Sequence, residues 1–554
     1  MQSCWVEVSD VRSRCGTATR ILPLVLACGI TVTACGQPDA PASDPDTTGE
    51  PRTGGTLVIA GPTDLGAMNS LVSNEAYTQE IQLHALFLPL VRLDSALDYT
   101  PALAHAWEID GDTAVVFHIR DDVRWHDGSP TSAYDVAFTF ERAKDPETAF
   151  PSADYFIEWN AVEVVDSFTV RFAIDPHMDP LTGWALTAVM PRHLLDSIPP
   201  GRMANAAFNR RPIGNGPFRF VAYQGNDRWT FEANPDFPES LGGRPYVDRV
   251  VWRVIPENAA QLTELETGGA DLILSPRAEQ LDPLDAQPDF RRIVRPSRRY
   301  VFIGWNGRRG PLGEPRVRHA LTMAIDRREI LQTLRSGYGE LMSGPVGPHH
   351  WAYDRALEPI PFDTAAAIAE LAAAGIRDSD GDGLLDTAAG EPFAIELKIP
   401  ANNAFNRDVA EMVQSDLAAI GVPLTPRPVE FSTLIGDISS ADRNFDAVLM
   451  AWETDLRLGL RDVFHSAELD GPFQLASYTN PLVDSLLDAA ANLTDRDAAL
   501  PLWHRLQRIV RDEQPWTFLW LAPDLYLIRE RIRGVEMDVR GAFVTLSDWW
   551  IDEP

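Results

Sequence analysis

One short segment of the sequence has the carboxylate spacing of a calcium-binding loop. Its acidic residues are Asp378, Asp380, Asp382 and Asp386. Counted from Asp378, they stand at positions one, three, five and nine, with Gly383 at position six, as at the start of an EF-hand loop. Position twelve is Ala389, where a complete loop has a bidentate glutamate. Two interpretations follow, a weak structural calcium site or a solvated turn, and neither makes this segment the functional site.

The sequence lacks the residue patterns of common enzyme active sites. It contains no G-x-S-x-G and no H-E-x-x-H motif. All 4 cysteines lie within the first 35 residues, so the rest of the chain has no thiol nucleophile and no cysteine-based metal site. His126 has no partnered nucleophile beside it, and the following Asp127-Gly128 predicts a tight turn that it stabilises. We therefore expect a protein that is not an enzyme and that has no cofactor apart from structural calcium.

The N-terminal residues have the features of an export signal. Basic residues precede the 14-residue apolar stretch Ile21–Ala34, which is short for a transmembrane helix. The stretch ends in Val32-Thr33-Ala34-Cys35, which resembles the bacterial lipobox. We expect residues 1–35 to be a lipoprotein signal peptide with lipidation at Cys35, and 36–53 to be a flexible linker. An uncleaved anchor, a signal peptide without lipidation, and lipidation at Cys28 are the alternatives.

Composition and charge limit the partners of the remaining chain. The 554 residues are enough for two to four domains, and 45% of them are hydrophobic. The formal net charge of −32 repels nucleic-acid phosphates and anionic headgroups, so we expect no nucleic acid and contact with a membrane only through the lipid anchor. The predicted location is extracytoplasmic, on a bacterial membrane facing either the periplasm or the cell surface.

The elements that must position any site indicate a mixed α/β protein. Apolar or alternating runs predict strands at 56–60, 114–119 and 168–174. Apolar residues at helical spacing predict helices at 132–142, 317–325, 364–374, 409–420 and 502–510. The sequence shows neither an internal repeat nor the glycine pattern of a dinucleotide or phosphate loop.

Seven blocks occur in the order and at the spacing of a known family. They are Val123–Gly128 with Pro130 and Tyr134–Thr139, Pro212–Phe218, Asn234–Phe237, Glu266–Asp271, Arg316–Leu321 with Ala324–Arg327, Trp351–Asp354, and Tyr478–Pro481. Together they resemble the large extracytoplasmic solute-binding proteins of ABC importers, the group that binds dipeptides, oligopeptides and nickel. Asn215 stands where the family usually has threonine, so the hydrogen bonds of that turn are expected to differ.

The resemblance implies an α/β fold, a bilobed periplasmic-binding-protein-like clamp with an extra inserted α/β domain. By position, the first lobe takes residues 54–95, 210–300 and 521–554, the inserted domain 96–209, and the second lobe 301–520. Closure of the lobes around a ligand would then create the shape that the transporter recognises. The implied protein is a monomer that delivers its ligand to ABC importer permease subunits.

The resemblance also implies ligand-binding residues. In peptide-binding relatives a tryptophan, here Trp452, and an aspartate three residues later, here Asp455, supply an aromatic wall and a carboxylate for the α-ammonium group. The stretch that follows departs from the family pattern, and a core tryptophan with a solvated aspartate is the alternative. Further expected ligand contacts are Trp305, Asn306, Asn74, Tyr77, Asn406 and Arg407.

Capture of a short peptide is the function that these residues indicate. A metal chelate or an oligosaccharide bound on the same fold is one alternative, and a sensory or structural lipoprotein without a transport role is another. Ligand-induced closure would distinguish a binding protein from a structural one.

Overall fold

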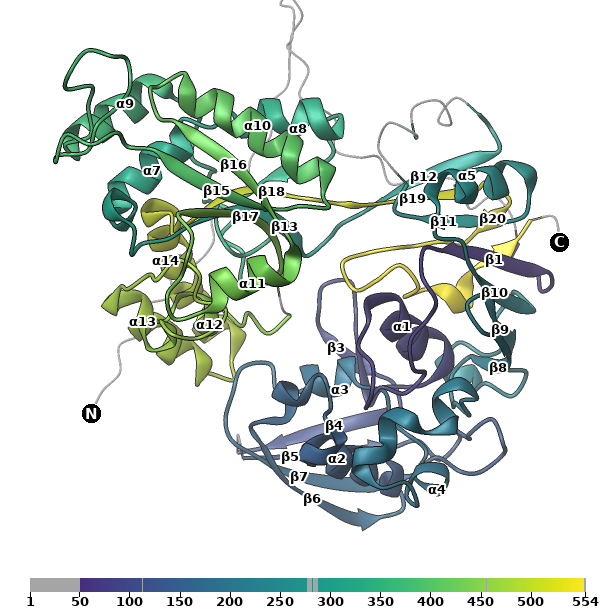
Figure 1. Ribbon diagram of the computed structural model, residues 1–554. Helices are drawn as coiled ribbons and strands as arrows, with labels where there is room; N and C mark the ends of the chain where they lie inside the picture. The colour runs from purple at the N-terminus through teal and green to yellow at the C-terminus, as the bar shows by residue number, and fades with distance from the viewer. Residues whose placement is uncertain (1–49, 112, 277–280, 282–286, 455, 553–554) are drawn as a thin grey trace, which may run out of the picture. The chain divides into compact units, whose positions relative to one another are not determined.

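The computed structural model describes residues 50–111, 113–276, 281, 287–454 and 456–552 (Figure 1). The predicted signal peptide with Cys35, and the predicted ligand residue Asp455, lie outside the described residues. Among the helices of these ranges, none combines the length and the apolar character needed to cross a membrane.

The first lobe is built on a seven-stranded mixed sheet. In spatial order its strands are β12 (Phe290–Arg295), β19 (Asp524–Arg529), β11 (Leu272–Leu274), β1 (Thr56–Gly61), β10 (Arg249–Val254), β9 (Arg228–Ala233) and β8 (Phe218–Gln224). Strand β1 is central and parallel to both neighbours, with Ile59 opposite Trp252 on one side and Leu272 on the other. Its apolar residues are buried, as expected for a parallel strand covered on both faces. Helices α1 (Ala76–Ile81) and α5 (Asn258–Thr267) and the small strands β20 (Ile532–Arg533) and β21 (Trp550–Ile551) complete this part.

The inserted domain is a four-stranded antiparallel sheet with helices on one side. The strand order is β4 (Ala104–Asp110), β5 (Ala114–Ile119), β7 (Thr169–Ile174) and β6 (Trp159–Asp166). Helix α2 (Ala133–Lys144) packs on this sheet, where the ring centroid of Phe140 lies 5.2 Å from that of Phe172. The shorter elements are β2 (Val91–Leu93), β3 (Tyr99–Pro101), α3 (Thr182–Leu186) and α4 (Arg192–Leu195). One apolar cluster runs without a break from the first-lobe sheet into this domain, so the two share a core.

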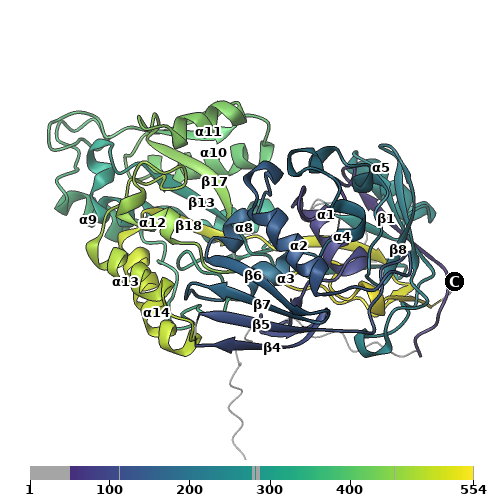
Figure 2. The ribbon, with the colours of Figure 1, turned by 90° about the horizontal axis from the view of Figure 1, so that it is seen from below.

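The second lobe has its own six-stranded sheet. The order is β14 (Glu340–Leu341), β18 (Trp516–Leu521), β13 (Arg299–Trp305), β17 (Ala447–Glu453), β15 (Ile395–Pro400) and β16 (Leu424–Val429). Its helices are α7 (Pro315–Met323), α8 (Arg327–Arg335), α9 (Thr364–Ala373), α10 (Ala404–Ala418), α11 (Phe431–Ser439), α12 (Arg461–Phe464), α13 (Pro481–Ala491) and α14 (Arg496–Glu513). Alternate residues of β13 enter two apolar clusters, Ile303 on one face and Phe302 on the other. Figure 2 shows α13 and α14 side by side, where they cover one of these faces.

The chain crosses twice between the two large sheets. Strand β12 leads into β13 through residues 296–298, and β18 leads into β19 through residues 522–523. Because β13 and β18 are hydrogen-bonded neighbours, both crossings lie side by side (Figure 1). Two short adjacent connections between separately cored lobes have the form of a hinge.

Candidate functional site

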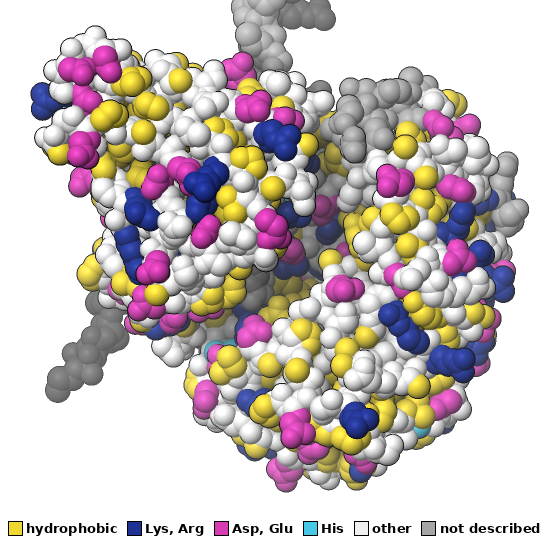
Figure 3. All heavy atoms as spheres, in the orientation of Figure 1, with side chains coloured by type: hydrophobic (Ala, Val, Ile, Leu, Met, Phe, Trp, Pro, Cys, Tyr) yellow, Lys and Arg dark blue, Asp and Glu magenta, His cyan; other side chains and the backbone are white. Residues whose placement is uncertain are grey.

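A cavity of about 560 Å³ lies where the two crossings meet the ends of the parallel strands. Strand β11 contributes Ser275 and Pro276 just beyond its carboxyl end, and β15 contributes Pro400. The other lining residues are Arg299, Val301, Arg335, Asn403, Phe405, Asn406, Phe431, Met450, Ala451, Ala522, Pro523, Asp524 and Leu525. The carboxyl ends of strands in open α/β sheets are the usual place for a ligand. The space-filling view shows the molecule hollowed in this region, with basic side chains inside the hollow (Figure 3).

Two arginines give one wall of the cavity a positive charge. Arg335 donates from Nε to the carbonyl of Tyr338 at 3.1 Å and from Nη2 to that of Pro523 at 3.2 Å. Burial lowers the pKa of Arg335, the charge of Asp524 opposes this change, and the charge of Arg299 adds to the lowering. Neither arginine forms an ion pair with a carboxylate among the described residues. Both guanidinium groups are therefore available to an anionic group of a ligand.

A carboxylate lies beside these two arginines in the lining. Asp524, the first residue of β19, pairs with Arg295. Burial raises the pKa of Asp524, whereas the charge of Arg295 opposes that change. Arg295 is itself held by the hydroxyl of Tyr526 and by the carbonyl of Asp538, each at 3.0 Å. The Asp524 carboxylate is thus fixed in place beside the cavity.

The remaining wall is apolar and includes an exposed aromatic ring. Phe431, the first residue of α11, is 57% exposed although it lines the cavity, and Met450 lies beside it in the lining. Phe405 places its ring 5.8 Å from the guanidinium carbon of Arg335. An exposed phenylalanine in a concave site provides apolar surface that a ligand can cover.

Three predicted ligand residues lie at or near this cavity in different ways. The Tyr77 hydroxyl is 3.4 Å from the Ser275 hydroxyl at the cavity edge, and burial raises the pKa of Tyr77. Asn74 instead donates to Ser152 of the inserted domain at 3.1 Å. Arg407 is exposed on α10, one residue beyond Asn406, and it does not line the cavity.

The structure corrects the prediction for Trp305 and Asn306. Trp305 is fully buried in the second lobe and donates to the Thr517 hydroxyl at 2.9 Å. The Asn306 amide, also fully buried, donates to the carbonyls of Arg443 and Phe445 at 2.9 and 2.7 Å. Because all these polar atoms are satisfied inside the lobe, both side chains belong to its core and do not reach the cavity.

Trp452 lies at the end of β17, next to the lining residues Met450 and Ala451. It is partly buried, and its ring centroid is 5.7 Å from both Trp516 and Phe473 in edge-to-face arrangements. Its side chain is not part of the cavity lining, although it shares a face of β17 with Met450, and both residues pack against the same apolar cluster of the second lobe. The residue before Asp455 is fixed through its backbone, since Thr454 donates to the carbonyl of Arg298 at 3.0 Å.

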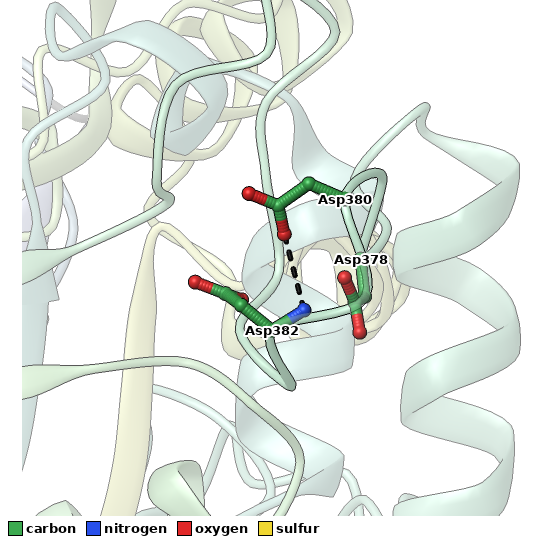
Figure 4. A group of neighbouring side chains, drawn as sticks. All are labelled: Asp378, Asp380 and Asp382. Atoms are coloured by element: carbon green, nitrogen blue, oxygen red, sulfur yellow. Dashed lines mark hydrogen bonds between the residues drawn. The ribbon is translucent and has the colours of Figure 1, made fainter.

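Three of the four predicted calcium ligands lie together. The carboxylates of Asp378, Asp380 and Asp382 offer oxygen atoms within 4.8 Å of one another, and all three residues are exposed (Figure 4). Asp386 does not join this group, which corrects the predicted set. Its Oδ2 already accepts the backbone N–H of Ser379 at 3.0 Å and the hydroxyl of the same residue.

Asn406, a predicted ligand contact, lines the cavity, and Tyr77 and Trp452 lie close to other lining residues. The remaining lining residues were not indicated by the sequence. Arg299 and Arg335 belong to a total of 48 lysines and arginines, so neither stands out by type. Phe405 and Phe431 begin helices, where an aromatic residue carries no motif. What marks all four is their place at the strand ends, which requires the sheet topology to be known.

Comparison with known proteins settles the family. The model of the bacterial extracellular solute-binding proteins, family 5 (Middle), matches residues 98–458. The chain belongs to this family. Its predicted bilobed α/β fold is thereby confirmed, since solved family structures share it.

Several members of the family are similar over most of their length. The oligopeptide-binding protein AppA of Bacillus subtilis is 29% identical over 542 residues, covering 97% of this chain and 99% of AppA. The structure of AppA in complex with a nonapeptide superposes with a TM-score of 0.73 at 28% identity, covering 91% of this chain and 100% of that one. Heme-binding protein A of Haemophilus influenzae is 27% identical over 462 residues, covering 79% of this chain and 81% of that protein.

Proposed function

We propose that this solute-binding protein captures a short peptide between its two lobes and delivers it to the permease of an ABC importer. The observation that carries the proposal is the pattern of charge in the 560 Å³ cavity. Arg299, Arg335 and Asp524 lie close together in this lining, which also contains the rings of Phe405 and Phe431. A zwitterion with apolar side chains is the ligand class that matches such a wall. The similarity to AppA, an oligopeptide-binding protein, supports the same choice.

Calorimetric titration with defined peptides tests the peptide assignment. Mixed di- to pentapeptides are expected to bind, and a tripeptide with both termini blocked is expected to bind at least a hundredfold more weakly, because both terminal charge pairs are lost. A metal-chelate panel, a heme and an oligosaccharide panel serve as competing ligands. If one of these ligands binds and no peptide does, that ligand class becomes the proposed solute, and the family assignment is unchanged.

We also propose that the protein acts as a monomer tethered by a lipid on Cys35. The apolar stretch and the lipobox-like residues before Cys35 support the lipid tether. Cys35→Ser is expected to abolish labelling by a fatty-acid probe and to stop processing of the precursor. Cys28→Ser is the matched control and is expected to change neither. The reverse pattern would move the anchor to Cys28.

A further inference from the structure

A second cavity, of about 80 Å³, has a strongly basic lining. It lies where α1, β2, α3 and the C-terminal segment come together with the crossing residue Arg298. Four of its lining residues are Arg92, Arg298, Arg540 and His84, and Glu80 is its one acidic lining residue among the described part of the chain. It shares no lining residue with the 560 Å³ cavity. In a protein of net charge −32, a concentration of arginine around one small cavity calls for a physical reason.

Arg92 forms no ion pair in the described chain, although Asp548 lies near enough for its charge to act on it. Its Nε is buried without a hydrogen-bond partner, and no carboxylate of the described residues forms an ion pair with its guanidinium group. Burial lowers the pKa of Arg92, the charge of Asp548 partly opposes this, and Arg540 adds to the lowering. Arg92 is partly buried and its Nε atom is shielded from water without a partner, which destabilises the fold, so an anion that enters the cavity would relieve that cost.

The other charges around the cavity are already engaged. Arg540 donates from Nε to Asp538 at 2.9 Å and from Nη1 to the carbonyl of Leu93 at 2.7 Å. Arg298 pairs with Glu453 at 3.0 Å. The Glu80 carboxylate accepts the backbone N–H groups of Ala542 and Phe543 at 2.6 and 3.0 Å. Glu80 is therefore committed to the C-terminal segment and does not neutralise Arg92.

His84 supplies an uncharged imidazole beside Arg92. It lies on a π-helical turn, Gln82–Leu86, a conformation that often marks functional positions. Burial, with the charges of Arg92 and Arg540, lowers the pKa of His84 to about 3. No hydrogen bond of its ring occurs within the described chain, so one imidazole N–H remains to be donated to a ligand.

We propose that this cavity binds an oxyanion, held by the guanidinium group of Arg92 and the imidazole of His84. Its volume admits one carboxylate or one tetrahedral oxyanion and excludes a peptide chain. The oxyanion is either a carboxylate group of the captured solute, reaching in from the cleft, or a free inorganic ion. Planar bidentate binding of carboxylate or phosphate-like groups is the characteristic chemistry of arginine.

The first experiment uses sulfate on the full chain without solute. Thermal unfolding is compared in sodium sulfate and sodium chloride of equal ionic strength for wild type, Arg92→Gln and the control Arg328→Gln. Arg328 is an exposed arginine on α8 whose side chain forms no hydrogen bond or ion pair in the described chain. Sulfate stabilises proteins in general, so only the part of the shift that is lost in Arg92→Gln counts as site binding. In chloride alone, Arg92→Gln is expected to melt at or above the wild-type temperature, because it removes an uncompensated charge.

The second experiment distinguishes the two sources and rests on the proposed peptide function. A peptide with a free C-terminal carboxylate is compared by calorimetry with its C-terminal amide. If the solute supplies the oxyanion, the carboxylate form binds wild type at least tenfold more tightly and binds Arg92→Gln no better than the amide does. If sulfate stabilises in an Arg92-dependent way and the two peptides bind alike, the ligand is a free ion.

Failure of the peptide function and failure of the oxyanion site give different results. If no peptide binds in either form, the proposed peptide function is wrong. The comparison of sulfate with chloride still tests whether the cavity binds an oxyanion. Should Arg92→Gln fail to fold, His84→Gln replaces it, and crystals grown with selenate reveal an anomalous peak in the cavity. The proposal is overturned if neither sulfate nor the peptide carboxylate depends on Arg92 or His84 and no selenate peak is found there.

Discussion

At the scale of single residues, the two arginines of the cavity, Arg299 and Arg335, differ in how firmly their guanidinium groups are held. Arg335 is anchored by two carbonyl groups, at Tyr338 and Pro523, so its guanidinium group is held in one orientation. Arg299 is exposed and has no such anchor in the described chain, so it can follow ligands of different length. An anchored and an adaptable cation in one cavity suit peptides whose carboxyl end varies in position.

The peptide proposal makes a specific prediction for Asp455, which lies outside the described residues. Asp455→Asn is expected to weaken binding of a free-amine tripeptide by two to three orders of magnitude, since loss of one partner of a buried charge pair costs roughly 3–5 kcal/mol. The N-acetylated tripeptide, already weak, is expected to change little, and calorimetry measures both. Trp452→Ala is the comparison variant and is expected to weaken both peptides alike. If Asp455→Asn weakens the binding of both peptides equally, Asp455 does not contact the peptide ammonium group directly.

A second residue-scale prediction concerns calcium at Asp378, Asp380 and Asp382, which we propose as a weak structural site. A chelator is expected to lower the melting temperature by no more than a few degrees, because three exposed carboxylates form an incomplete oxygen cage. Asp380→Ala is expected to erase that difference and to leave solute affinity unchanged. If the melting temperature is the same in millimolar calcium and in chelator, the segment is a solvated turn without a calcium site.

At the scale of elements, local sequence patterns predicted where strands and helices lie in the chain, but they did not predict which strands pair in the sheets. Strand β5 has the predicted bounds, and α9 ends one residue before the predicted end at 374. Helix α14 begins at Arg496, six residues before the prediction, with Pro501 inside it. Packing of its buried face overrides the local disfavour of a proline. The pairing of β1 with β10 joins segments about 190 residues apart, and no local pattern contains that register. The cavity residues were missed for this reason.

Two of the sequence blocks form one structural unit that neither block predicts alone. The His126 imidazole bridges the second block, accepting the Gly214 N–H at Nδ1 (3.2 Å) and donating from Nε2 to the Gly216 carbonyl (3.0 Å). The His126 side chain thus stabilises a turn, but that turn is Gly214–Gly216 and not the predicted Asp127-Gly128 turn. A Cβ atom at Gly214 would come within 1.9 Å of the Leu86 carbonyl oxygen, so only glycine fits there. Asn215 accepts the Leu88 N–H at 2.9 Å, which closes the same unit.

The His126 bridge predicts a pH dependence of stability. Burial lowers the pKa of His126 to about 4, so the unfolded chain binds a proton that the folded chain does not between about pH 4 and the ordinary value of 6.5. The contribution of this group is therefore complete above pH 6.5 and is lost as the pH falls toward 4, by roughly 3 kcal/mol at most. Denaturant unfolding of wild type and His126→Gln at pH 7.5 and pH 4.5 measures it. The free-energy difference between the two proteins is expected to be larger at pH 7.5, and a constant difference would contradict the assignment.

At the scale of the whole molecule, the inserted domain shares its apolar core with the first lobe. It meets the second lobe through charged contacts and a few apolar ones, such as Met178 in a second-lobe cluster and Leu97 with Leu456. The main contact is Arg496 at the start of α14, whose Nε lies 2.8 Å from Asp179 and whose Nη1 lies 3.0 Å from Asp98. Trp351 of the second lobe donates to the same Asp179 at 3.2 Å. The side chain of Asp179 is only 5% exposed, so this pair is largely removed from water. The continuous apolar core with the first lobe, against a smaller set of charged and apolar contacts with the second lobe, predicts that the inserted domain moves with the first lobe.

The Arg496 contact therefore stabilises the arrangement of lobes described here, and its loss is expected to shift the protein toward more separated lobes. Arg496→Gln leaves the Asp179 carboxylate without its cationic partner, a change that costs several kcal/mol when the pair is buried. Because solute binding between the lobes depends on their approach, affinity is expected to fall about tenfold or more, with a larger radius of gyration in X-ray scattering without solute. Arg505→Gln, an exposed position on the same helix, is the control and is expected to match wild type in both measurements. The prediction is wrong if Arg496→Gln keeps the wild-type radius of gyration and solute affinity. The contact between Arg496 and Asp179 would then not control the separation of the lobes. In that case the inserted domain would move with the second lobe when the chain bends at residues 296–298 and 522–523.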